Sequence, residues 1–244
     1  MTAPSGTDRV GLRAFDRNVP VFSVTPQTWR ALIGIDLDVK AGPYPVSIDA
    51  QADGRETHTT YELRVLPRKF LTRKLHVDPS FVHPPADTRE RIAREAADLQ
   101  QIWRSPIPER LWTRGFLRPV AGAIASSFGT RSIYNGESRP PHSGADFRSP
   151  EGTPVHAPAG GRVVLARELY FSGNTLVIDH GLGVFSLLAH LSTFDVREGD
   201  SVAADQILGR VGATGRVTGP HLHWAMRVGG ARVDPLSVLA VLGQ

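Results

Sequence analysis

The chain has 244 residues, of which 41% are hydrophobic and 21% charged, a balance typical of a soluble globular protein with two modest domains. Arg, Asp or Gly interrupts every apolar stretch before it reaches the roughly 18 residues that a membrane-spanning helix needs, so the sequence predicts no such span. Cysteine is absent, which excludes disulfides and thiolate metal sites and leaves histidine and carboxylate side chains as the strong ligands.

The basic pI of about 9.8 comes mainly from arginine, since lysine occurs only at Lys40, Lys69 and Lys74. Such a charge balance suits nucleic acid, but also anionic wall polymers and lipid headgroups. The arginines are spread along the chain without a dense run, so we expect no nucleic-acid binding. Residues 1–12 lack a basic stretch followed by an apolar core and are not predicted to be a signal peptide.

Residues 1–78 are predicted to form a β-sandwich accessory domain of immunoglobulin-like type. Asp53-Gly54 supplies residues that tolerate positive φ and predicts a hairpin turn. No cluster of His, Asp and Glu with ligand spacing occurs in this part of the sequence. The expected strands are Val21–Val24, Ala31–Val39, Tyr44–Ile48 and Thr59–Val65.

Residues 79–113 are predicted to be a helical connector between the domains. The prolines at 84–85 end the strands, and Asp87 with Glu90 three residues later indicates an N-cap with a capping-box partner. Apolar residues then recur at helical spacing and predict a face that packs on a neighbouring domain. These residues are Ile92, Ala96, Leu99 and Trp103.

Residues 114–244 are rich in glycine and in predicted strands, and six of the nine histidines lie there. Such a concentration is typical of a metal or acid–base site. The expected strands are Gly161–Arg167, Thr175–Asp179, Val184–Leu191, Ile207–Val211 and His221–Val228.

Two short motifs in this half bring together metal-ligating residue types. His142 and Asp146 are four residues apart, and Gly144 between them allows a tight backbone path. His221 and His223 alternate on a predicted strand, so both imidazoles are expected on one face. Taken alone, either motif is also explained by ordinary core or surface residues.

A third element, His190, lies in an otherwise apolar strand, where an imidazole without a partner would be costly to bury. A single histidine of this kind is often a satisfied core residue. Together the three elements offer three nitrogen or oxygen ligands with a fourth position open, which is the pattern of catalytic zinc, and two histidines remain for proton transfer.

These motifs resemble the lysostaphin/LytM-type peptidoglycan metalloendopeptidases of peptidase family M23. The resemblance covers about residues 115 to 238 and implies a C-terminal antiparallel β domain of the lysostaphin-like, duplicated hybrid motif type, so that the whole chain is mainly β. It extends to the phrases Glu151–Val155, Gly160–Val163, Asp179–Gly183, Gly199–Val202 and Val233–Pro235.

Carried over by position, the resemblance implies one zinc ion held by His142, Asp146 and His223. Zinc lowers the pKa of a bound water to about 7 and polarises the scissile carbonyl. His190 and His221 are implied to stay uncoordinated. We assign His221 as general base and His190 as the group that stabilises the oxyanion or protonates the leaving amine, although the two could exchange roles.

The sequence departs from the family pattern at two positions. Members often carry Tyr two residues before the uncoordinated strand histidine, where this chain has Leu188, and Glu or Gln where it has Ala225. Both departures are expected to alter the binding cleft or a contact to the ligands, not catalysis. Tyr170 could supply a phenol to the cleft or be a surface aromatic.

Other polar residues of this half are assigned structural or solvent-exposed roles, because three ligands and two further histidines complete the site. They are His156, Asp179 and His180, and the arginines Arg139, Arg162 and Arg216, which could contact acidic groups of a wall peptide.

The resulting hypothesis is a monomeric zinc endopeptidase that cuts peptide stems of bacterial peptidoglycan in the cell envelope, with a signal sequence absent from this chain. The N-terminal domain could be an inhibitory lid. A non-catalytic LytM-type regulator or wall-binding module is the alternative, although every ligand position is filled. Gly199–Gly209 is also similar to biotinyl and lipoyl carrier domains, but no lysine for attachment follows Lys74.

Overall fold

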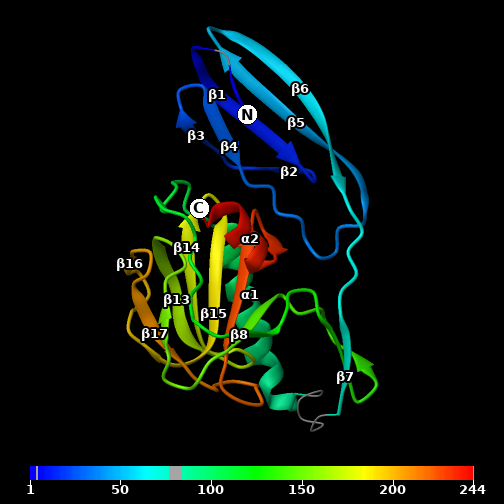
Figure 1. The fold of residues 1–244 in the computed structure, drawn as a ribbon, viewed down its shortest axis with the longest axis vertical. Coiled ribbons are helices and arrows are strands. Elements are labelled where there is room, and N and C mark those ends of the chain that lie inside the picture. Colours follow the sequence, from blue (N-terminus) through cyan, green and yellow to red (C-terminus); the bar gives the residue numbers. More distant parts are fainter. Residues whose placement is uncertain (4, 77–83, 244) are drawn as a thin grey trace. The chain divides into compact units, whose positions relative to one another are not determined.

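The computed structural model describes residues 1–3, 5–76 and 84–243. These residues form two compact units, Met1–Lys69 and Phe70–Gln244 (Figure 1). The fold class is mainly β and the sheets are almost wholly antiparallel, as the sequence predicts. The expected boundary between the first domain and the connector, at 78/79, lies outside the described residues.

The first unit contains a four-stranded antiparallel sheet in the order β2-β1-β5-β6 and a separate hairpin of β3 and β4. A small core of Leu12, Ala14 and Val46 holds the unit together, and side chains of β3 and β4 pack against it. The immunoglobulin-like description stays a prediction. The strands are β1 (Thr7–Ala14), β2 (Arg17–Asn18), β3 (Val21–Thr25), β4 (Thr28–Ala31), β5 (Gly42–Ala52) and β6 (Arg55–Val65).

The hairpin predicted at Asp53-Gly54 joins β5 to β6, and both residues have positive φ, 49° and 73°. The strand expected over Ala31–Val39 is wrong, because only Ala31 is in a strand. Asp36 closes a turn there by accepting from the backbone N–H of Asp38. The central strand β1 was not expected.

The second unit is built on a ten-stranded sheet, whose main path runs β16-β13-β14-β15-β18-β11-β8. A smaller sheet has the order β10-β9-β7, with β7 parallel to β9. The strands are β7 (Thr72–Leu75), β8 (Ala123–Ser126), β9 (Arg131–Tyr134), β10 (Glu137–Ser138), β11 (Gly144–Arg148), β12 (Pro154–His156), β13 (Gly161–Leu169), β14 (Gly173–Gly181), β15 (Val184–Phe194), β16 (Ser201–Val202), β17 (Ile207–Val211), β18 (Leu222–Val228) and β19 (Ala231–Val233).

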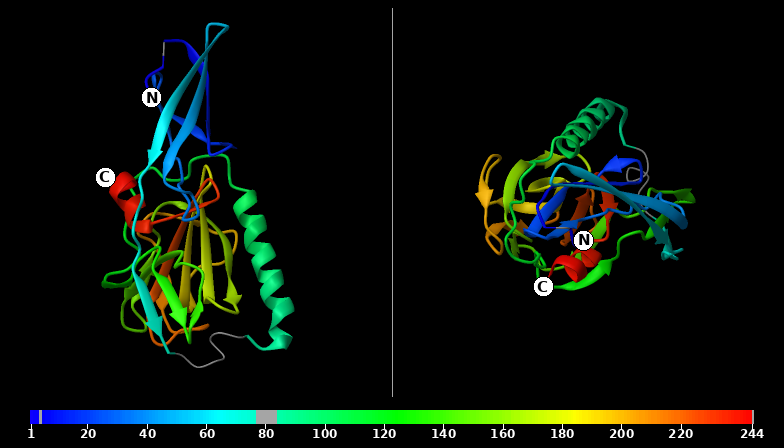
Figure 2. Two further views of the ribbon diagram at one scale, coloured as in Figure 1. Left: turned by 90° about the vertical axis from the view of Figure 1, so that its right-hand side faces the viewer. Right: turned by 90° about the horizontal axis from the view of Figure 1, so that it is seen from above.

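Helix α1 (Arg89–Arg104) packs along one face of this sheet (Figure 2). Leu99, Ile102 and Trp103 contact a buried cluster from β13, β14 and β15, so the apolar helical spacing is explained by packing within the second unit. The ring of Trp103 meets that of Phe185 edge-on, with centroids 5.1 Å apart.

The capping box expected at Asp87 and Glu90 is absent. A short 3-10 helix, η2 (Ala86–Thr88), leads into α1, so Thr88 is the N-cap and makes no side-chain cap bond. Its hydroxyl donates to the carbonyl of Pro85 instead. At the other end of the unit, Asp234 caps α2 (Pro235–Leu242) by accepting from the N–H of Leu236.

Among the described residues, no helix combines the length and apolar character that crossing a bilayer requires.

His180 on β14 belongs to a buried chain of hydrogen bonds in the core of the second unit. The hydroxyl of Ser186 contacts both His180 Nε2, at 2.9 Å, and the indole Nε1 of Trp224, at 3.3 Å, while His180 Nδ1 lies 2.8 Å from the carbonyl of Gly160. An Nδ1–H that donates to Gly160 satisfies every member. Burial lowers the pKa of His180 to about 4, with the Gly160 carbonyl acting in the opposite direction.

We predict that this histidine makes stability depend on pH. Between about pH 6.5 and 4 the unfolded chain binds a proton at residue 180 and the folded chain does not, so the free energy of unfolding falls as pH falls. The loss is up to about 3 kcal/mol. Urea unfolding across this range should show a shallower pH dependence in His180→Gln than in the wild type. Equal slopes in both proteins would contradict the assignment.

Candidate metal centre

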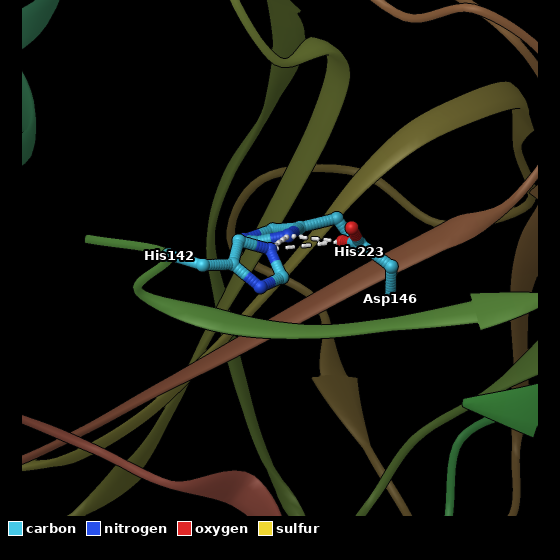
Figure 3. A group of neighbouring side chains, drawn as sticks. All are labelled: His142, Asp146 and His223. Carbon is cyan, nitrogen blue, oxygen red and sulfur yellow. Dashed lines mark hydrogen bonds and ion pairs between the residues drawn. The ribbon is translucent and has the colours of Figure 1, made fainter. Parts of the chain in front are cut away.

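Three polar side chains converge at one end of the paired strands β11 and β18 (Figure 3). Asp146 on β11 lies directly opposite His223 on β18, and His142 precedes β11 in the chain. His142 Nε2 is 3.0 Å from both Asp146 Oδ1 and His223 Nδ1, and His223 Nδ1 is 2.8 Å from Asp146 Oδ1. The three ligand atoms therefore form a nearly equilateral triangle.

The triangle fits a tetrahedral zinc ion. Ligand atoms about 2.0–2.1 Å from zinc at tetrahedral angles stand roughly 3.3 Å apart, close to the edges observed. Hydrogen bonds alone do not explain why the three atoms lie so close together. If both histidines donate to Asp146, their two N–H groups face each other across 3.0 Å, whereas a cation at the centre satisfies all three lone pairs.

His142 is oriented by partners on its far side. Its Nδ1 lies 3.1 Å from the carbonyl of Ser127 and 3.3 Å from the hydroxyl of Ser126. An Nδ1–H that donates to the carbonyl leaves the Nε2 lone pair for a metal, which is the arrangement typical of metal-ligating histidines. The backbone N–H of His142 also donates to the carbonyl of Thr130.

His221 directly precedes β18 and shares one face with His223, as predicted, while Leu222 and Trp224 are fully buried on the other face. Gly144 serves a purpose other than the one expected. A Cβ at this position would lie 2.4 Å from the Trp224 carbonyl oxygen and 2.8 Å from His223 Cε1. Glycine is therefore needed for the close approach of β11 to β18.

His190 reaches the same face through a β-bulge in β15. Asn174 of β14 pairs with Leu191 of β15, and Leu176 pairs with Leu188, so β15 has one more residue than β14 between these two pairs. His190 has a φ of 65°, and the bulge turns its side chain toward the site. Its Nδ1 lies 3.0 Å from the carbonyl of Thr214, which is the partner that the sequence could not name.

His221 lies beside His190, with ring centroids 4.8 Å apart. Its Nδ1 is 2.9 Å from the carbonyl of Gly219, and its Nε2 is 3.8 Å from Asp146 Oδ1. Both histidines thus have Nδ1 against a backbone carbonyl. In the neutral state Nδ1 carries the proton, and Nε2 is left as a proton acceptor.

The protonation states suit a cation. Burial raises the pKa of Asp146, but hydrogen bonds from His142 and His223 outweigh it and hold the pKa well below its ordinary value. Burial lowers the pKa of His223, and that of His190 to about 4, where the neighbouring histidines His223 and His221 add to the effect. At neutral pH Asp146 therefore offers an anionic carboxylate and His223 a neutral imidazole, the forms that bind metal.

The histidines and the aspartate that were assigned structural or solvent-exposed roles do not belong to the ligand triangle. His180 belongs to the core chain described above, and His156 pairs with Asp205 at the surface, 3.1 Å away. Asp179 is buried and accepts from the backbone N–H groups of Ile107 and Gly181, which fixes a turn, and burial raises its pKa.

The expectation that Leu188 shapes the binding cleft is wrong. Leu188 pairs with Trp224 in the core, and the bulge puts it on the face opposite His190. Ala225 does share the face of His223, opposite Leu187. Tyr170 is half-buried against helix α1, where its N–H donates to Glu95 and Arg91 lies 5.9 Å from its ring centroid.

Comparison with known proteins identifies the family. The profile of peptidase family M23 matches residues 140–235. A crystal structure from Pseudomonas aeruginosa described as a peptidase M23 is 31% identical, covers 98% of this chain and 89% of its own, and superposes with a TM-score of 0.71. The chain belongs to peptidase family M23.

Curated relatives of this M23 chain are longer. The DD-carboxypeptidase/endopeptidase Mpg of Neisseria meningitidis is 43% identical over 115 residues, which are 47% of this chain and 26% of Mpg. The peptidoglycan DD-endopeptidase ShyA of Vibrio cholerae is 34% identical over 169 residues, 69% of this chain and 35% of ShyA. The chain thus spans about a quarter to a third of the length of these relatives.

We predict that Asp146→Asn lowers zinc affinity by more than about a hundredfold, since loss of a direct ligand should exceed the 10- to 100-fold effect of outer partners. Competition with a chromogenic chelator measures the affinity. His156→Gln is the matched control, because His156 also pairs with an aspartate but lies elsewhere, and it should bind zinc like the wild type. Equal affinities in Asp146→Asn and wild type would exclude this carboxylate as a ligand.

Proposed function

We propose that this chain is a zinc metalloendopeptidase that hydrolyses peptide cross-links of bacterial peptidoglycan. The observation that carries the proposal is the triangle of ligand atoms of His142, Asp146 and His223, with edges of 2.8 to 3.0 Å, beside two histidines that are not part of it. Family membership and the names of Mpg and ShyA support the substrate class.

His142, Asp146 and His223 would hold one zinc ion, which suits their nitrogen and carboxylate donors and the absence of cysteine. When bound with a position open, zinc supplies an acidified water and polarises the scissile carbonyl. One carboxylate against a divalent ion leaves the centre with a net positive charge, which favours the negative charge that develops on the carbonyl oxygen.

His221 acts as the general base in this proposal. Its Nδ1–H donates to the Gly219 carbonyl, so Nε2 is the free lone pair, and that atom is 3.8 Å from the carboxylate oxygen of the ligand triangle. It takes a proton from the attacking water as the new C–O bond forms. The scissile C–N bond then breaks, and the proton passes to the leaving amine.

His190 has the second role, close to the developing oxyanion or the leaving amine. The Thr214 carbonyl fixes its Nδ1–H, and burial keeps the imidazole neutral, so it must first accept a proton at Nε2 before it can donate one. With ring centroids 4.8 Å apart, His190 and His221 are close enough to exchange roles, as the sequence left open.

The domain assignment and location follow as parts of the same proposal. Residues 114–244 would be the peptidase domain and residues 1–78 an accessory domain that targets the enzyme or covers its cleft. Its peptidoglycan substrate puts the monomeric enzyme in the cell envelope. A non-catalytic regulator is disfavoured, because all three ligand positions are filled and converge.

We predict that His221→Ala lowers kcat by about 10²- to 10⁴-fold, the usual contribution of a general base. Zinc-loaded wild type and variant are incubated with purified sacculi, and the released fragments are identified by mass spectrometry, which also shows the bond that is cut. Bound zinc, measured by elemental analysis, should be unchanged. A variant as active as the wild type would contradict the role of His221, and intact sacculi with zinc-loaded wild type would contradict the function.

A further inference from the structure

His142 is the one residue of the ligand triangle that does not lie on a strand of the large sheet. Asp146 and His223 face each other on β11 and β18, whereas His142 comes before β11 begins. A ligand on paired strands is held by the strand pairing itself, but a ligand on a loop needs other supports. The geometry of the centre therefore depends on what holds His142.

The turn of residues 127–130, which joins β8 to β9, supplies that support. The carbonyl of Ser127 contacts the Nδ1 of His142, 3.1 Å away, and the carbonyl of Thr130 accepts from its backbone N–H at 2.9 Å. The N–H of Gly129 donates to the carbonyl of His142 at 2.8 Å. Backbone and ring of His142 are thus both attached to one turn, and a shift of the turn moves the ligand.

The ring of Phe70 packs directly on this turn. A Cβ built on Gly129 would overlap two ring carbons of Phe70, so the ring occupies the place of the missing side chain. Gly129 is buried and has a φ of 79°, a conformation that favours glycine. A larger residue at this position would push the ring away, which indicates that the ring and the turn fit each other as a pair.

The residues after Phe70 continue the contact as strand β7, which pairs in parallel with β9 (Figure 1). The carbonyl of Leu71 accepts from the N–H of Arg131 at 2.8 Å, and that of Leu75 accepts from the N–H of Asn135 at 3.1 Å. The segment is therefore docked at both ends of β9, the strand that follows the turn.

A side-chain contact joins β7 to the segment that leads into His142. Arg73 Nε donates to the hydroxyl of Ser132, 3.0 Å away, and Ser132 is buried. The carbonyl of Ser132 accepts from the backbone N–H of Arg139, three residues before the ligand. Strand β9 thus has the docked segment on one side and the chain that carries His142 on the other.

We propose that residues 70–75 are part of the metal centre: they fix the turn 127–130 and so position His142, and Phe70 is the main positioning residue. The inference rests on the proposed function, since the zinc ion of that site is the ligand it concerns. Phe70 directly follows Lys69, which ends the first unit, so the metal-binding unit starts well before the first ligand. A ligand that is held in place beforehand loses less entropy when the metal binds.

Variants of the full chain test the role of Phe70. Phe70→Ala should lower zinc affinity by about tenfold, the lower end of the range for partners beyond the ligands. Phe70→Tyr keeps the ring and should bind zinc within about threefold of the wild type. Competition with a chromogenic chelator measures the affinity, and thermal unfolding without zinc measures stability.

Trp103→Leu is the matched control, because it also removes a half-buried ring from the second unit. Trp103 packs on the cluster of β13, β14 and β15 and not on the turn, so this variant should lose stability and keep its zinc affinity. If Phe70→Ala and Trp103→Leu bind zinc equally well, or if Phe70→Tyr binds as weakly as Phe70→Ala, the positioning role is wrong.

Hydrogen exchange of the wild type gives a test that needs no variant. Coupling between two binding events is reciprocal, so a segment whose docking tightens zinc binding about tenfold must itself be docked about tenfold more firmly when zinc is bound. The amides of Arg131 and Asn135, which donate to the segment, should then exchange about tenfold more slowly with zinc. The amide of Ala157, which donates to Gln206, should change little. No slowing, or equal slowing at all three amides, would overturn the proposal.

Failure of this inference is distinguishable from failure of the proposed function. A wild type that binds zinc through the triangle, with Phe70→Ala binding it as tightly, would remove Phe70 from the centre and leave the peptidase in place. A wild type that binds no zinc would overturn the proposed function and this inference together.

Discussion

The pairing of β11 with β18 is the constraint on which the site depends. It sets Asp146 directly across from His223, so a carboxylate oxygen and an imidazole nitrogen lie 2.8 Å apart without any loop having to bring them together. Gly144 makes the pairing possible, because a side chain there would strike the Trp224 carbonyl and the His223 ring. A ligand set on a rigid sheet is preorganised for metal, which limits the entropy lost on binding.

Backbone carbonyls organise the rest of the centre. Those of Ser127, Thr214 and Gly219 each face the Nδ1 of one histidine, at 2.9 to 3.1 Å. One kind of contact therefore favours the same tautomer in His142, His190 and His221, with the proton on Nδ1 and the lone pair on Nε2. Because these acceptors are main-chain groups, their positions follow from the fold and not from side-chain identity.

The sequence predicts those parts of the structure that follow local rules. Spacing on a strand predicts that His221 and His223 share one face, and the strand-rich segments after residue 114 predict β13, β14, β15, β17 and β18. The prediction from the sequence is wrong where one inserted residue reverses which side chains of a strand face the core. The bulge near His190 reverses the alternation of β15, so Leu188 faces the core although two positions separate it from a site residue.

Other features could not be anticipated for physical reasons of the same kind. A 3-10 helix, which no residue type in the sequence indicates, occupies the position where Asp87 was expected to cap α1. A turn closed by Asp36 replaces most of the strand expected over residues 31–39. The backbone carbonyls that contact the histidines cannot be predicted from the sequence, because every residue carries such a group. Roles for His142, Asp146, His190, His221 and His223 are implied by the resemblance to the M23 metalloendopeptidases, and the structure adds why their geometry suits those roles.

The central claim is that two imidazole nitrogens and one carboxylate oxygen bind a single divalent ion with a position left open. X-ray absorption at the zinc edge of the loaded protein tests it most directly. We expect four nitrogen or oxygen neighbours at about 2.0–2.1 Å, with multiple scattering from two imidazole rings. Scattering from three or four imidazoles, or a six-coordinate aqueous spectrum with no imidazole signal, would contradict the account.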